Sequence, residues 1–254
     1  MKTRQLAKFL APVYRSYQTN MLPGTFLAVR LQLQVPGVVM ERRKETHVSL
    51  TWRDSFNQVA AQLMKTSGFD IKVAYVYGSE IHLLIAEDCM MFQRDLQKSV
   101  SALAAEATLA FSYMQKHPGT FDCRICGCGT WEYVFDYFSH ERTNCRSHAI
   151  NHLCRYAMQI MFPDAKPEHI DQKMAGMDHD ARVAYMKAFG TIHHGGTHLD
   201  PWFEHGHILK WTWYKKMVSA EEQVDARRVD MSHAQSNNGL NYHDFFCDAV
   251  FNNE

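Results

Sequence analysis

The feature that most constrains the fold is the spacing of hydrophobic residues in the first half of the chain. This spacing switches in a fixed order between the period of a strand and the period of a helix. Residues 25–35 alternate strictly, with aliphatic side chains on one face and Arg30, Gln32 and Gln34 on the other. A period of two residues is typical of a half-buried strand. Residues 49–68 then place apolar side chains three and four positions apart, which predicts an amphipathic helix.

The same switching continues as far as residue 128. Further strands are predicted at 69–77, 81–86 and 120–126, and a second long helix at 91–117. The resulting order, strand–helix–strand–strand–helix–strand, is the split βαβ or ferredoxin-like arrangement. Strands one and three are central neighbours in that sheet. We therefore expect the end of the first strand, near Gln32, to lie beside the tight turn Gly78-Ser79-Glu80.

The second half of the chain has mostly a helical period. Helices are predicted at 131–141, 146–162, 167–177 and 179–190, followed by a histidine-rich loop, a strand at 207–216 and a polar tail. The last helix is expected to end at Gly190. The sequence therefore predicts an α+β protein with two parts. These are a ferredoxin-like β-α-β-β-α-β domain at 1–128 and a mostly helical extension with a C-terminal strand and tail at 129–254.

The charge balance gives no general attraction toward nucleic acid or membrane, because 27 lysines and arginines offset 27 aspartates and glutamates. A nucleic-acid surface would have to be local, and short basic stretches occur at 41–45, 210–216 and 226–228. Each stretch taken alone is more typical of a solvated charged face. No run of about 18 apolar residues predicts a membrane span, and the N-terminus does not have the pattern of a secretory signal.

Two clusters of metal-ligating residue types stand out. Cys123, Cys126 and Cys128 form C-x-x-C-x-C, but a strand is predicted there, and residues three apart in a strand point to opposite faces. The second cluster consists of His193, His194, His198, His205 and His207. The sequence leaves both open as metal sites and favours neither. The seven cysteines, in a chain without a secretory signal, favour reduced thiols and a cytoplasmic location.

Four stretches of the chain form a recognisable series. They are MLPGTFLAVRLQ at 21–32, FDIKVAYVYGSEIHLLI at 69–85, FDCRICGCGTWEYVFDYFSHERTNC at 121–145, and KAFGTIHHGG with WFEHGHILKW within 187–211. Together they resemble the tRNA-histidine guanylyltransferase family, whose members add nucleotides in the 3′-to-5′ direction, and they occur in the family's order over about residues 20–215. The second stretch resembles the family's S-D-E hairpin, which here reads Ser79-Glu80-Ile81.

The resemblance implies a palm domain related to nucleotide polymerases. It also implies Mg²⁺-dependent activation of a tRNA 5′ end with ATP, followed by addition of GTP, in a homodimer or homotetramer. Two hard cations about 4 Å apart need oxygen ligands and negative charge to gather a triphosphate and its nucleophile. In the family these ligands are an aspartate that ends strand one, a neighbouring glycine carbonyl and the hairpin aspartate.

Carried over residue by residue, the family's metal ligands fall on Glu80, Gln32 and Leu33, and Glu80 is also the predicted catalytic residue. Gln32 replaces a carboxylate with a neutral amide, which should cost on the order of a thousandfold in rate for two-metal chemistry. The other contacts implied by the resemblance are Ser79 and Gln34 for the nucleotide, and Arg142, Asn151 and His152 for RNA.

Two interpretations follow. The first is an enzyme that adds GTP to the 5′ end of a tRNA or other RNA with Mg²⁺. The second is a palm-fold protein that has lost this chemistry and binds nucleotide, RNA or a protein partner. Glu80 has two interpretations as well, a metal ligand or an exposed turn residue, and its burial and pKa distinguish them. Asn151 and His152 are equally consistent with capping or interhelical hydrogen bonds.

Overall fold

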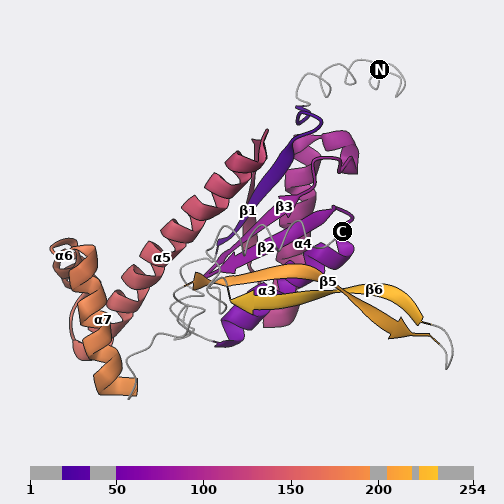
Figure 1. Ribbon diagram of the computed structural model, residues 1–254. Helices are drawn as coiled ribbons and strands as arrows, with labels where there is room; N and C mark the ends of the chain where they lie inside the picture. The colour runs from indigo at the N-terminus through magenta and orange to yellow at the C-terminus, as the bar shows by residue number, and fades with distance from the viewer. Residues whose placement is uncertain (1–18, 35–49, 195–204, 219–222, 234–254) are drawn as a thin grey trace, which may run out of the picture.

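The computed structural model describes residues 19–34, 50–194, 205–218 and 223–233, which form an antiparallel six-stranded sheet and the helices around it (Figure 1). In chain order the elements are β1 (Phe26–Gln34), α3 (Leu50–Thr66), β2 (Ile71–Tyr77), β3 (Glu80–Ile85), the 3₁₀ turn η1 (Met91–Arg94), α4 (Leu96–Gln115), β4 (Thr120–Cys128), α5 (Trp131–Met161), α6 (Pro167–Ala175), α7 (His179–His194), β5 (His207–Met217) and β6 (Gln223–His233).

The strands lie in the order β4-β1-β3-β2-β5-β6, so the first four strands have the predicted ferredoxin-like topology. β1 and β3 are neighbours, and their register places Gln32 directly opposite Glu80. Gly78 and Ser79 make a two-residue turn between β2 and β3, in which Gly78 has a φ of +54°. Type II′ hairpin turns favour glycine at this first position. The α+β class and the closeness of positions 32 and 80 are confirmed.

The strict alternation in β1 separates the two faces of the sheet. Leu27, Val29, Leu31 and Leu33 point to the face that α3 and α4 cover, where they join the largest apolar core. Ala28 points to the opposite face and packs with apolar residues of the first turns of α5. Since α5 covers only part of this second face, the polar residues of β1 and β3 lie beside its first turns rather than under an apolar layer.

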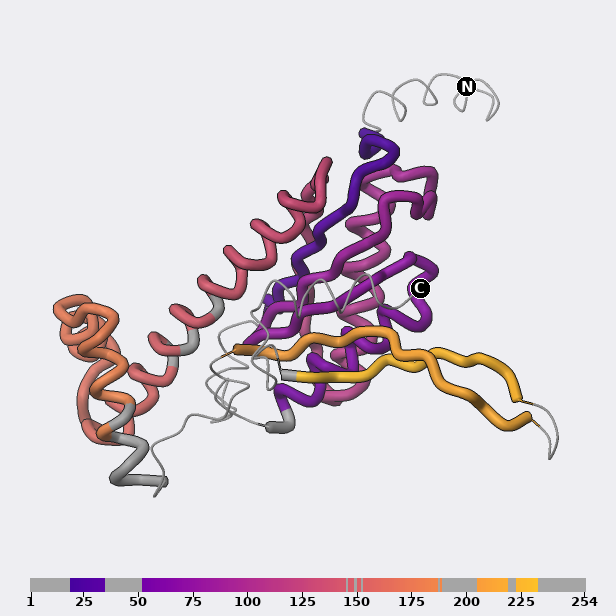
Figure 2. Tube along the Cα trace, viewed as in Figure 1, coloured from indigo at the N-terminus to yellow at the C-terminus, as the bar shows by residue number. Residues whose placement is uncertain are grey.

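α5 is a single helix of 31 residues that runs away from the sheet to a small bundle with α6 and α7 (Figures 1 and 2). Its first turns bury Val134 and Phe138 against the sheet, whereas its last turns pack Cys154 and Met158 against α6 and α7. The sequence predicted two separate helices here, at 131–141 and 146–162. Residues 142–145 contain neither proline nor glycine, so nothing in them ends a helix.

Three other boundaries differ from the predicted ones. Residues 91–94 form a 3₁₀ turn with left-handed backbone, so α4 begins later, at Leu96, behind its N-cap Asp95. α7 continues through Gly190 to His194. The predicted polar tail contains the strand β6. Its side chains are mostly polar, and none of the described ones is buried, so the sequence has no strand pattern there. The segment is a strand because it pairs with β5.

The sheet crosses the domain boundary predicted at residue 128, because β5 pairs with β2 along residues 73–76. The division into 1–128 and 129–254 stays a prediction about folding units. The part of the second segment that leaves the sheet is the α6–α7 bundle at the far end of α5 (Figure 2). No helix within the described ranges has the length and hydropathy needed to cross a membrane.

Candidate functional site

Glu80 lies at the start of β3, immediately after the hairpin turn, with only 8% of its surface exposed. The interpretation of Glu80 as an exposed turn residue is therefore wrong. Its side chain points to the same face of the sheet as Gln32, because directly opposed residues of antiparallel strands project to one side. A carboxylate buried in this way needs charged or hydrogen-bonding partners.

Arg30 is the main partner of Glu80. Its Nε donates to Glu80 Oε2 at 2.9 Å and its Nη2 donates to Oε1 at 2.7 Å, so both carboxylate oxygens accept from one guanidinium. Burial alone would raise the pKa of Glu80, but polar contacts with His82 and Arg30 outweigh it and lower the pKa to about 2. Glu80 is therefore ionised at neutral pH and held in a fixed orientation by a bidentate ion pair.

His82 lies two residues further along β3, on the same face, and is fully buried. Its Nδ1 is 3.0 Å from the hydroxyl of Tyr137 on α5. Its Nε2 is 3.3 Å from Glu80 Oε2, an ion-pair distance, yet this buried nitrogen has no hydrogen-bond partner among the described residues. One ring nitrogen is thus satisfied and the other faces a carboxylate oxygen.

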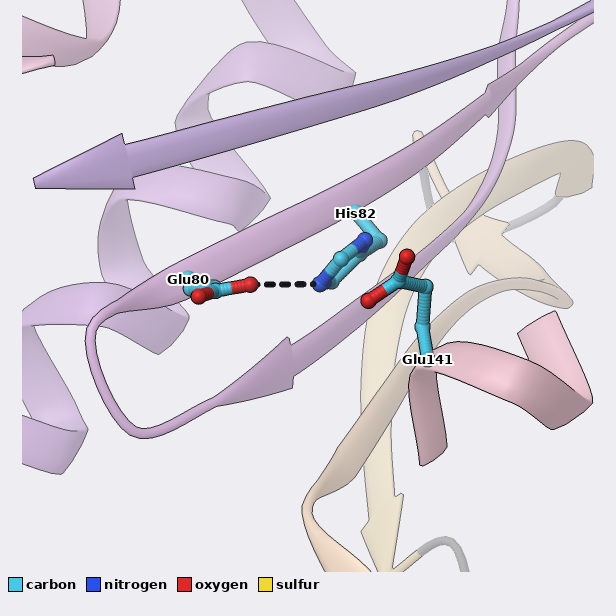
Figure 3. Close-up of side chains that lie close together, drawn as sticks. All are labelled: Glu80, His82 and Glu141. Carbon is cyan, nitrogen blue, oxygen red and sulfur yellow. Dashed lines mark ion pairs between the residues drawn. The ribbon is translucent and has the colours of Figure 1, made fainter. Parts of the chain in front are cut away.

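Glu141 comes from α5 and completes a group of three possible metal ligands with Glu80 and His82 (Figure 3). One ligand atom from each residue lies within 4.8 Å of the other two. Glu141 is one helical turn beyond Tyr137, so both side chains project from the same side of α5. In Figure 3 the Glu141 carboxylate faces the side of the imidazole ring that points away from the β3 backbone.

A wider polar surface surrounds this group. The register across β4, β1 and β3 places Asp122, Gln32 and Glu80 in one row, and Arg124, Arg30 and His82 in the next. The side chain of Arg124 is 73% exposed and that of Arg30 is 28% exposed. The two rows therefore present guanidinium, amide and carboxylate groups together on one face of the sheet.

The other residues predicted from the resemblance lie at the same edge of the sheet but in different surroundings. Leu33 is buried in the core between the sheet and its two covering helices, and its backbone N–H donates to Ser79 O at 3.0 Å. Ser79 is half-buried in the hairpin turn, and Gln34 is exposed at the end of β1. The structure thus gathers positions 32, 33, 79 and 80 around one turn.

The three predicted RNA contacts all lie on α5. Arg142 is half-buried, with Nη2 3.4 Å from Nδ1 of His205. Asn151 accepts a hydrogen bond from Arg182 of α7 at 2.6 Å, which matches the alternative role of an interhelical hydrogen-bond group. The side chain of His152 lies outside the described residues. Their contact with RNA stays a prediction.

Comparison with known proteins shows a similarity to one enzyme family. Residues 49–128, which run from the start of α3 to the end of β4 and include Glu80, match the model of the tRNAHis guanylyltransferase family. The tRNA(His) guanylyltransferase of Debaryomyces hansenii is 24% identical over 206 residues, which cover 74% of each chain. Over residues 49–128 the chain is therefore similar to the tRNAHis guanylyltransferase family.

Solved structures of tRNAHis guanylyltransferases share the fold. The enzyme from Saccharomyces cerevisiae has a TM-score of 0.64 at 14% identity, over 79% of this chain and 92% of its own. A bacterial tRNA(His) guanylyltransferase-like protein in complex with ATP has a TM-score of 0.66 at 17% identity, over 96% and 97% of the two chains. The complex of such a protein with GTP gives 0.66 at 15% identity, over 97% and 99%.

The residues at positions 32 and 80 do not fit the two Mg²⁺ ions that the tRNAHis guanylyltransferase family implies. Gln32 is neutral, and both oxygens of Glu80 already accept from Arg30. Gln32, Glu80 and Arg30 together therefore carry no net negative charge. Mg²⁺ requires oxygen ligands in near-octahedral geometry and is bound through carboxylates.

Three residues of this site were not predicted from the sequence. Arg30 and His82 could have been found, because each lies two residues from a predicted ligand on a strand and so shares its face. Glu141 has no such signal, since it reaches the site only through the packing of α5 on the sheet.

The cysteine cluster is divided between the two faces, as the strand prediction requires. Cys123 joins the core under α3 and α4, whereas Cys128 joins the cluster under α5. The three thiols therefore do not converge on one metal. Of the five histidines of the second cluster, only His205 and His207 lie within the described side chains.

Proposed function

We propose that the protein binds a nucleoside triphosphate, GTP or ATP, together with the 5′ end of a tRNA or other RNA on the polar sheet face beside α5. The observation that carries this proposal is the pair of registered rows Asp122–Gln32–Glu80 and Arg124–Arg30–His82. Guanidinium groups suit phosphate oxygens because their planar fork matches them. The names of the related bacterial structures, which include complexes with ATP and GTP, support a triphosphate as one ligand.

Binding without two-metal chemistry is the version of this function that the side chains support best. Arg30 engages both oxygens of Glu80, and Gln32 contributes no charge. The palm-like frame and the polar rows are compatible with ligand binding, because a scaffold can outlast the chemistry of its site.

Mg²⁺-dependent addition of GTP to the RNA 5′ end is the second candidate function. It is favoured by one observation, the ionised carboxylate of Glu80 at the hairpin position where the family places its catalytic aspartate. This function needs a metal that the residues at positions 32 and 80 do not fit. Glu80, Gln32 and the carbonyl of Leu33 are its predicted ligands.

The binding proposal is tested with purified protein, a 5′-monophosphorylated tRNA and GTP, each titrated with Mg²⁺ and with EDTA. We expect measurable binding of both ligands. Arg124→Gln should weaken tRNA binding roughly tenfold, because it removes about one charge-assisted hydrogen bond. Lys65→Gln is the matched control, since Lys65 is exposed on α3, on the opposite side of the sheet. Equal affinities in the two variants, or no binding by the unmodified protein, would overturn the proposal.

The same samples distinguish the two candidates. Incorporation of labelled GTP into the tRNA, lost in Glu80→Gln, would establish nucleotide addition. Binding of both ligands without incorporation is the outcome we expect. A cytoplasmic location and a homodimeric or homotetrameric state are further predictions, and light scattering of the purified protein tests the second.

A further inference from the structure

We propose that Glu80, His82 and Glu141 form a site for one divalent first-row transition metal such as Zn²⁺, displaced along β3 from the family's two-metal position. The group draws two ligands from one strand and the third from α5 (Figure 3). This site goes beyond the proposed function and does not depend on it, because the metal alone is the ligand to be tested.

The distances suit a single small cation. Two ligand atoms on one tetrahedral zinc, each about 2.0–2.1 Å from the metal, lie about 3.3 Å apart. The distance between His82 Nε2 and Glu80 Oε2 is already 3.3 Å. The third ligand atom, from Glu141, lies within 4.8 Å of the other two. The proposed site requires the half-buried Glu141 side chain to turn so that its carboxylate oxygen lies about 3.3 Å from the other two ligand atoms.

His82 gives an independent reason to place a cation here. Its Nε2 is fully buried, faces the carboxylate of Glu80 and has no hydrogen-bond partner among the described residues. An imidazole whose Nδ1–H donates to the Tyr137 hydroxyl carries a lone pair on Nε2. In the other tautomer Nε2–H points at the Glu80 carboxylate at 3.3 Å, and a metal would displace that proton and bind both atoms.

The ligand types select the class of metal. Imidazole nitrogen suits zinc, iron, nickel and copper, whereas Mg²⁺ and Ca²⁺ prefer oxygen alone. Three protein ligands also leave one coordination position open, as in zinc sites that bind water or a substrate. Tyr137 contacts the other nitrogen of His82, and such partners fix the ring orientation of metal-bound histidines.

The local charge favours this position over the family's. Glu80 and Glu141 contribute two negative charges and Arg30 one positive charge, which leaves one net negative charge around the proposed site. At positions 32 and 80 the corresponding sum is zero, because Gln32 is neutral. Arg30 can remain bound to Glu80, since each carboxylate oxygen has a second lone-pair direction for a metal.

The test is titration of the purified full chain with Zn²⁺ by calorimetry and with Co²⁺ by absorption spectroscopy. We expect one equivalent to bind, and the Co²⁺ spectrum to lack the intense charge-transfer band of sulfur ligands. His82→Gln and Glu141→Gln should each weaken binding at least tenfold. Glu132→Gln and His140→Gln, which alter exposed residues of the same helix as Glu141, should leave the affinity unchanged.

Tyr137→Phe provides a variant that retains all three ligands. Loss of the hydroxyl beside Nδ1 should weaken Zn²⁺ binding by about 10- to 100-fold while one equivalent still binds. Circular dichroism confirms the folding of each variant, and Glu141→Gln keeps the test decisive if His82→Gln fails to fold. Absence of a bound equivalent would overturn the proposal, as would equal affinity in Glu141→Gln and Glu132→Gln. A sulfur band that disappears in Cys126→Ser would also overturn it.

Discussion

At the scale of single residues, the stability of the site depends on an ion pair that is mostly removed from water. The side chains of Arg30 and Glu80 are 28% and 10% exposed, so each charge has lost much of its hydration. Breaking such a pair on one side leaves the other charge uncompensated, which costs more than the pair itself contributes. The Arg30–Glu80 pair is therefore expected to affect folding as well as ligand binding.

Glu80→Gln should lower the free energy of unfolding by about 1–3 kcal/mol, because the buried guanidinium loses its counter-charge. Urea denaturation followed by circular dichroism, with EDTA present, measures the change. Glu87→Gln is the control at an exposed position and should change stability by less than about 0.5 kcal/mol. A loss in Glu80→Gln no larger than that of the control would show that the ion pair contributes nothing to the fold.

The thiols of β4 should differ in reactivity. Burial, assisted by Asp122, raises the pKa of Cys123 to about 12, and burial, with Cys126 nearby, raises the pKa of Cys128 to about 11. Thiolate is the reactive form, so both should react slowly at neutral pH and faster as the pH rises. The thiol of Cys126 is exposed and should be alkylated first.

Iodoacetamide labelling followed by peptide mass spectrometry measures this order. Trypsin cleaves after Arg124 and so separates Cys123 from the other two cysteines of β4. Labelling of Cys123 in the folded protein at the same rate as Cys126 would contradict the burial of its side chain.

At the scale of elements, the attachment of β5 to the sheet depends on one glycine. Gly206 precedes β5 with a φ of +73°, and an added Cβ would lie 2.8 Å from Tyr75 Cε2 and 2.8 Å from Val76 O. Gly206→Ala should therefore destabilise the protein by about 2 kcal/mol or more, since both the backbone conformation and the space exclude a side chain.

Gly78→Ala is the matched control. Gly78 also has a positive φ, +54°, but nothing lies within 4 Å of its added Cβ, so only the backbone cost of about 1 kcal/mol applies. Thermal unfolding of the two variants compares the costs. Equal losses of stability in the two variants would show that the contact between position 206 and β2 adds no cost.

At the scale of the whole molecule, β5 and β6 form a long hairpin that extends beyond the rest of the sheet (Figure 2). It joins two of the three basic stretches, because Trp213 pairs with Arg227 and Thr212 with Arg228. Arg227 also packs over the ring of Trp211 at 4.2 Å. Trp211 itself is buried in the core, but Trp213 and Tyr214 are exposed further along β5. Exposed aromatic side chains beside basic ones are typical of single-stranded nucleic-acid binding.

The proposed RNA binding therefore predicts an effect of Lys215 and Lys216, both exposed on this hairpin. Their replacement by glutamine should weaken tRNA binding and reduce the slope of log affinity against log salt by about 1 for each phosphate that is no longer neutralised. The matched control replaces Lys65 and Lys116, which are exposed near the ends of α3 and α4. Equal slopes in the two double variants would show that the β5–β6 hairpin does not contact the RNA.

The local patterns of the sequence were enough for the strands and helices of the palm-like sheet and for the pairing of β1 with β3. Alternation in β1 fixes which of its residues face the core, because a shift of one residue would expose all the aliphatic side chains. The neighbourhood of Gln32 and Glu80 follows from that topology. The single helix α5 and the strand β6 were not evident, since helix continuity and strand pairing depend on partners far away in the chain.

The amino-acid sequence by itself therefore determined the order of the first four strands, the polar face of β1 and the carboxylate at position 80. Only the tertiary structure decided what that carboxylate contacts. Arg30 reaches it from the neighbouring strand β1, and Glu141 approaches His82 because Val134 and Phe138 pack the start of α5 on the sheet. The spacing of hydrophobic residues can be read within a single segment of the sequence. The chemistry of a site depends on distances between segments, and these distances are determined by tertiary packing.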